Sequence, residues 1–159
     1  MVPFYSQKWK QYYPEDTKRG IYLHFERNIH PYVRDWLIVY TRWLRKEFEY
    51  PVCLNIYCQR GKKITCSDGS PAYGIMIAPE NRNRKPRIRL ACGELEINCQ
   101  QSKELFEETD YIMISLTHEI VHYFQYINGF DLDRSRGIEW QATYWSRRIF
   151  RYFDSLYDE

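Results

Sequence analysis

Two histidines and a glutamate stand close together in the stretch Thr117-His118-Glu119-Ile120-Val121-His122. Residues four apart lie one above the other on a helix, so His118 and His122 can direct two imidazole nitrogens at a single metal ion. Glu119 can reach a water molecule at that metal but is poorly placed to bind the metal beside both histidines. The spacing therefore predicts a zinc site with an open position and a neighbouring carboxylate base, as in a metal-dependent hydrolase.

An ordinary helix can carry two histidines four residues apart by chance, and such a pair needs no metal. Two features of the chain favour the metal site. Histidine is scarce, and two of the four histidines form this pair. Apolar residues also surround the motif on nearly all sides, as expected of a central helix: Ile112, Met113, Ile114, Leu116, Ile120, Val121, Phe124 and Ile127.

A catalytic zinc site normally has three protein ligands and one water, so the two histidines need a partner. The other histidines, His24 and His30, lie far upstream, and none follows His122. A third histidine after the motif is therefore excluded. Asn128-Gly129 predicts the end of the metal helix, with glycine in the left-handed conformation.

The third ligand is expected to be an acid that follows this helix. Glu139 lies in the first turn of a second predicted helix and is the favoured ligand. Asp131 and Asp133, in the loop between the helices, are the alternatives. The explanation that needs no metal is that Glu139 only complements the positive N-terminus of its helix.

The segment His118-Glu119-Ile120-Val121-His122, together with Glu139-Trp140-Gln141-Ala142, resembles a minimal gluzincin, similar to the minigluzincin and ImmA/IrrE-type metallopeptidases. These motifs lie in about the last third of the chain. The resemblance implies a zinc peptidase with three metal ligands and a general base. The ligands are His118, His122 and Glu139, and the base is Glu119.

The resemblance also bears on the surroundings of the metal. In HExxH peptidases an edge strand above the metal helix pairs with the extended substrate backbone, and the run from Tyr73 to Ala78 has the corresponding place. Thr143 stands where the thermolysin-like pattern has an aspartate, so the support that this aspartate gives is absent or changed here. Tyr144 and Tyr126 are candidate donors to the oxyanion of the reaction.

The elements that must position this site predict an α+β fold, arranged as a small zincin-like domain. Residues 1–28, broken by prolines and a glycine, are expected to form an N-terminal arm. Pro31 begins an amphipathic helix of about 18 residues. A three-stranded sheet, the metal-binding helix and a C-terminal glutamate helix follow. The expected strands and the last helix are Val52–Cys58, Tyr73–Ala78, Arg87–Cys92 and, approximately, Ile138–Phe153.

Length and composition limit the number of domains, the kinds of partner and the cellular compartment that are expected for this chain. The 159 residues predict a single domain, residues 1–159. The formal net charge of +2 favours neither nucleic acid nor membrane as a partner. No apolar run approaches the roughly 18 residues of a membrane span, and no secretory signal is evident. The five cysteines form no C-x-x-C pair, which is typical of reduced thiols in a cytoplasmic protein.

The predicted function is that of a zinc-dependent peptidase, which hydrolyses peptide bonds of a peptide or protein substrate through a metal-activated water with Glu119 as general base. One alternative is a zincin-fold regulatory or binding module with little or no general proteolytic activity. Another is a metal-free interaction protein that uses an aromatic surface. The sequence does not determine the oligomeric state or the substrate.

Overall fold

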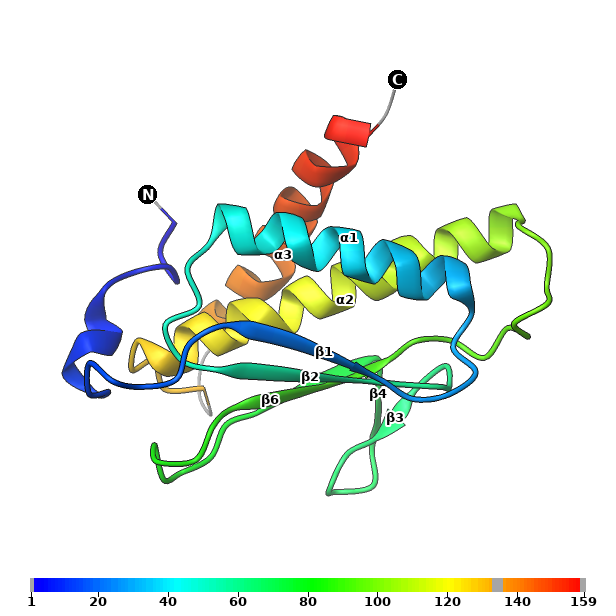
Figure 1. The fold of residues 1–159 in the computed structure, drawn as a ribbon. Helices are drawn as coiled ribbons and strands as arrows, with labels where there is room; N and C mark the ends of the chain where they lie inside the picture. The colour runs from blue at the N-terminus through cyan, green and yellow to red at the C-terminus, as the bar shows by residue number, and fades with distance from the viewer. Residues whose placement is uncertain (1, 133–135, 158–159) are drawn as a thin grey trace.

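The structure, a computed structural model, describes residues 2–132 and 136–157 (Figure 1). The fold is mixed α+β, as predicted from the sequence. Three α-helices accompany a four-stranded sheet and a two-stranded sheet among the described residues. The elements are η1 (Lys8–Gln11), β1 (Ile21–Phe25), α1 (Pro31–Glu47), β2 (Leu54–Gln59), β3 (Ile64–Thr65), β4 (Pro71–Ala72), β5 (Gly74–Ile77), β6 (Arg87–Ala91), α2 (Lys103–Ile127) and α3 (Arg136–Tyr157).

The main sheet has the strand order β1-β2-β6-β5. The first three of these strands are parallel, and β5 runs antiparallel to β6 at the edge. Helices α1 and α2 lie over one face of the sheet, and the β3–β4 hairpin lies on the other side (Figure 1). Successive side chains of a strand point to opposite faces of the sheet, so burial alternates along β2. Leu54 and Ile56 are buried, and Tyr57 is exposed.

The prediction of a three-stranded sheet was wrong. The fourth strand, β1, lies within residues 1–28, where the sequence analysis expected only an arm. Its register pairs Ile21 with Leu54 and Phe25 with Cys58 of β2. The alternation of Ile21, Leu23 and Phe25 with polar or amphipathic residues was the available signal. The small β3–β4 sheet was also missed, because each of its strands has only two residues.

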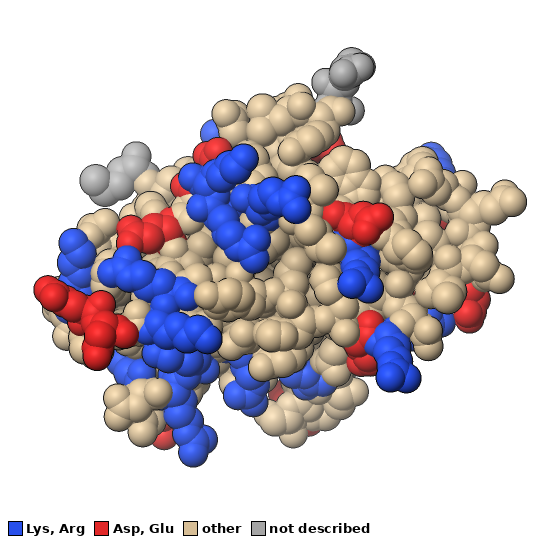
Figure 2. Space-filling model, in the orientation of Figure 1, with Lys and Arg blue, Asp and Glu red and all other residues tan. Residues whose placement is uncertain are grey.

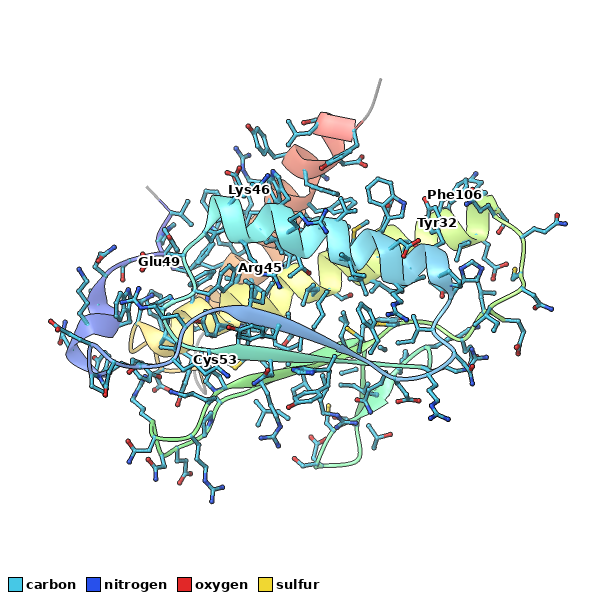
Figure 3. The ribbon with its side chains drawn as sticks, in the orientation of Figure 1. Tyr32, Arg45, Lys46, Glu49, Cys53 and Phe106 are labelled. Atoms are coloured by element: carbon cyan, nitrogen blue, oxygen red, sulfur yellow. The ribbon has the colours of Figure 1, made fainter. Side chains whose placement is uncertain are left out.

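Both ends of α1 are fixed by identifiable contacts. Pro31 is the first helical residue, as predicted, and the side chain of His30 accepts a hydrogen bond from the backbone N–H of Tyr32. At this end Tyr32 lies against Phe106 of α2, with ring centroids 5.1 Å apart (Figure 3). Near the other end the Arg45 guanidinium donates to the carbonyl of Ile21, which ties α1 to β1 (Figure 3).

The surface carries both signs of charge. Figure 2 shows Lys and Arg side chains gathered over the C-terminal half of α1, with acidic side chains at separate places around them.

None of the helices in the described part of the chain combines the length and apolar character needed to cross a membrane.

The end of α2 is held by the N-terminal segment. Gly129 has φ +84°, so the predicted left-handed glycine after the helix of the histidine motif is confirmed. Asn128, which is 2% exposed, accepts a hydrogen bond from the Trp9 N–H and donates to the Phe4 carbonyl. Residues far apart in sequence therefore fix the end of the helix that carries the histidine motif.

Candidate metal centre

Helix α2 extends on the N-terminal side beyond the apolar residues around the histidine motif, the first of which is Ile112. It begins at Lys103, after Ser102, whose side-chain oxygen accepts a hydrogen bond from the Leu105 N–H. Fifteen residues of α2 are buried, which matches the apolar character of the motif on nearly all sides. The buried hydroxyl of Tyr123 contacts the backbone at Val52, just before β2. The motif is thus carried by a helix that is fixed against the sheet.

The structure brings His118, His122 and Glu139 together. One carboxylate oxygen of Glu139 lies 3.2 Å from Nε2 of His118, and the other lies 2.9 Å from Nε2 of His122. Two ligand atoms at about 2.0–2.2 Å from one tetrahedral zinc ion lie roughly 3.3 Å apart. Both separations are close to this value, so the donor set fits zinc. Asp133, an alternative ligand, lies outside the described residues, and Asp131 lies in the loop before α3.

The electrostatic environment favours a neutral imidazole at His118. Burial, followed by the neighbouring His122, lowers the pKa of His118, and this outweighs the opposite effect of Glu139. A neutral imidazole is the form that ligates a metal. The side chain of Glu139 is 66% exposed, so it remains open to solvent.

A residue that the sequence analysis missed supports His122. Gln125 is fully buried, and its Oε1 lies 2.7 Å from Nδ1 of His122. Since a side-chain amide oxygen only accepts, Nδ1 carries the proton and Nε2 keeps its lone pair for a metal. Gln125 also donates from Nε2 to the carbonyl of Ile138 and to Oε1 of Gln141, both on α3. The available signal was a glutamine three residues after a histidine on one helix face.

Glu119 is oriented by the edge strand. The backbone N–H of Met76 donates to Oε1 of Glu119 at 2.9 Å. Oε2 faces the histidines, 4.0 Å from Nε2 of His118. Burial, together with the charge of Glu139, raises the pKa of Glu119 from 4.5 to about 8, and the Met76 N–H only partly opposes this. One oxygen is thus held by the backbone while the other is available to exchange a proton.

The run predicted as an edge strand does form one, as β5. The Ala91 N–H donates to the Tyr73 carbonyl, and the register pairs Gly74 with Leu90 and Met76 with Ile88. Hydrogen-bonded and non-hydrogen-bonded pairs alternate in antiparallel sheets, so the backbone groups of Gly74 and Met76 point away from β6. Part of this free edge therefore lies beside Glu119 and can pair with another extended chain.

A cavity of about 340 Å³ opens beside His118 and Glu119. Neither tyrosine suggested as an oxyanion donor lines it. The hydroxyl of Tyr126 donates to the Pro79 carbonyl at 2.5 Å, and the ring of Tyr144 stacks on Trp140. The cavity is lined by Ala72, Tyr73, Gly74, Tyr111, Ile114, Ser115, His118, Glu119, Thr143, Ser146 and Arg147.

No protein-family model, curated protein or solved structure matches this chain.

Proposed function

We propose that this protein is a zinc-dependent peptidase, with His118, His122 and Glu139 as the metal ligands and Glu119 as the general base. The single observation that carries the proposal is the contact of both histidine Nε2 atoms with the two oxygens of one carboxylate. Two neutral nitrogens and one carboxylate form a ligand set that leaves a fourth position open.

Each step of peptide hydrolysis is assigned to a particular chemical group of the site. A zinc ion held by this set would supply Lewis-acid polarisation of a carbonyl and a more acidic water. Oε2 of Glu119 is the atom that accepts the water proton and then passes it to the leaving amine. The Met76 N–H holds Oε1 and leaves Oε2 directed at the reacting atoms. Burial excludes bulk water from this carboxyl group, which is 9% exposed.

The substrate is proposed to bind as an extended chain. The backbone N–H and C=O of Gly74 and the C=O of Met76, on the free edge of β5, provide main-chain hydrogen bonds, as in other cases of strand addition, whereas the Met76 N–H stays with Glu119. This mode recognises the peptide backbone, so it allows many sequences unless neighbouring side chains select among them.

Zinc content is the first test of the proposal. Elemental analysis of purified protein should find about one zinc per chain. Glu139→Ala should weaken zinc binding by on the order of 100-fold, because it removes a ligand. Glu104→Ala, which changes another exposed glutamate in the first turn of a helix, is the matched control and should bind zinc normally. Zinc affinity that is unchanged in Glu139→Ala would remove Glu139 from the ligand set.

Hydrolysis is the second test. Zinc-loaded protein should cleave peptides of a random library, and Glu119→Gln should abolish cleavage without loss of zinc. Substantial cleavage by this variant would show that Glu119 is not the base. Zinc binding without cleavage of casein or of any library peptide would instead favour the alternative of a binding or regulatory module.

A further inference from the structure

The cavity beside His118 has a positively charged wall. Arg147 of α3 lines it, and no described residue forms an ion pair with Arg147. Ile114 and Ser115, one turn before His118, line the same cavity. An unpaired guanidinium beside an apolar and hydroxyl-bearing surface is suited to a ligand group that is itself anionic.

The position of Arg147 relative to the metal ligands fits a substrate side chain. Glu139, Thr143 and Arg147 are spaced four residues apart, so they follow one ridge of α3. Eight residues of helix separate the backbones of Glu139 and Arg147 by about 12 Å. Both side chains are long, which shortens the gap between their charged ends to a length that an amino-acid side chain can bridge.

The rest of the cavity lining adds little competing charge. Among the described residues that line it, Glu119 is the only carboxylate, and the Met76 N–H already holds one oxygen of that group. Three further acids of α2 line a neighbouring cavity of about 370 Å³, where Lys62 and Lys63 lie with them. These acids are Glu104, Glu107 and Glu108. Among the described residues that line the cavity next to the histidines, Arg147 is therefore a cation without an ion-pair partner.

The direction of β5 indicates which substrate residue enters. Antiparallel pairing is slightly more stable than parallel pairing. A peptide that adds antiparallel to β5 runs with its C-terminal side toward Gly74 and Tyr73, and both residues line the cavity. The residue that follows the cleaved bond is thus the one whose side chain lies nearest Arg147.

We propose that this cavity is a specificity pocket for an acidic side chain, aspartate or glutamate, immediately after the cleaved bond, and that Arg147 recognises its carboxylate. The planar guanidinium can form two parallel hydrogen bonds with a carboxylate, which a lysine or leucine side chain cannot accept. The inference rests on the proposed zinc peptidase function, because the metal defines which bond is cleaved.

Binding of small zinc-directed ligands tests the pocket without relying on catalysis. The probes are the mercaptoacetyl derivatives of glutamic acid α-amide, leucine amide and lysine amide, titrated calorimetrically into zinc-loaded protein. The thiol places each side chain at the position after the cleaved bond. The glutamate ligand should bind at least about 10-fold more tightly than the lysine ligand. Arg147→Glu should reverse this order.

A neighbouring arginine provides the control. Arg148 lies over the rings of Tyr144 and Trp145, and it does not line the cavity. Arg148→Glu makes the same change of charge and should leave the order of affinities unaltered. A reversal of the order in Arg148→Glu as well would mean that overall charge, rather than the pocket, decides affinity, and would overturn the proposal.

The remaining outcomes separate the pocket from the metal centre. Equal affinities of the three ligands, with zinc present, would overturn the specificity pocket and leave the proposed peptidase standing. A preference for mercaptoacetyl-leucine free acid over its amide, without a preference for glutamate, would overturn it in favour of recognition of a chain-terminal carboxylate. Absence of zinc together with absence of any binding would overturn both the pocket and the proposed function.

Discussion

Gln125 accepts a hydrogen bond from Nδ1 of His122 at 2.7 Å while its own amide nitrogen donates to the carbonyl of Ile138. One buried side chain thus orients a proposed ligand on α2 and also holds the start of α3, the helix that carries Glu139. The thermolysin-like sequence pattern has a supporting aspartate at the position where this chain has Thr143. Here the structure provides an acceptor for a histidine from the metal helix itself.

Gln125→Leu should weaken zinc binding by about 10–100-fold, because His122 loses the acceptor that fixes its tautomer and ring orientation. Gln125→Glu keeps an acceptor for Nδ1 and loses the amide donor to the Ile138 carbonyl and to Oε1 of Gln141. Its zinc affinity should therefore stay closer to that of the wild type. Competition with a chromophoric chelator measures both values. Equal losses in the two variants would show that the link to α3, rather than the bond to His122, is what matters.

The contribution of Glu119 to the unfolding free energy of the metal-free protein should fall as pH rises from about 4.5 to about 8. The pKa of this buried carboxyl is raised to about 8 in the folded protein, so the folded state binds the proton more tightly than the unfolded state across this range. The contribution is at most on the order of 5 kcal/mol. Glu119→Gln cannot lose a proton, so the variant should lack this part of the decline.

Thermal unfolding of both proteins between pH 5 and pH 9, with zinc removed by a chelator, checks this prediction. The lowered pKa of His118 acts in the opposite direction, since its contribution is lost as pH falls through the folded-state value. His118 is present in both proteins, so the difference between the two profiles isolates Glu119. Parallel profiles would show that Glu119 is not perturbed by its burial.

Thr117→Val should cost about 1–3 kcal/mol of unfolding free energy, more than Tyr40→Phe. The Thr117 hydroxyl donates to the Met113 carbonyl, so in the buried contact of 2.5 Å the Tyr40 hydroxyl is the donor to Thr117. Valine leaves this donor unsatisfied, whereas phenylalanine leaves only an acceptor lone pair unfilled.

Urea denaturation of the two single variants and the double variant measures the coupling. The double variant should be less destabilised than the sum of the single changes, because it removes both partners. Strict additivity would mean that the contact between α1 and the histidine helix contributes nothing of its own to stability.

Local sequence was enough to predict the three α-helices, the start of α1 and the end of α2. Pro31 begins α1, and Gly129 follows α2 in the left-handed conformation, because both signals act through the backbone of a few neighbouring residues. The spacing of His118 and His122 likewise needs only the geometry of one helix. The strand Ile21–Phe25 was missed, because a short amphipathic segment becomes a strand only when a partner such as β2 supplies its hydrogen bonds.

By itself, the sequence of this protein determined an α+β chain with two helical histidines, an adjacent glutamate and a later glutamate at a helix start. The tertiary structure alone decided which groups meet: Glu139 with both histidines, the Met76 N–H with Glu119, and Arg147 with the cavity beside them. The physical reason is the distance along the chain over which each kind of interaction acts. Helix spacing is fixed over a few residues of backbone, whereas these contacts join different elements and depend on how the helices pack on the sheet.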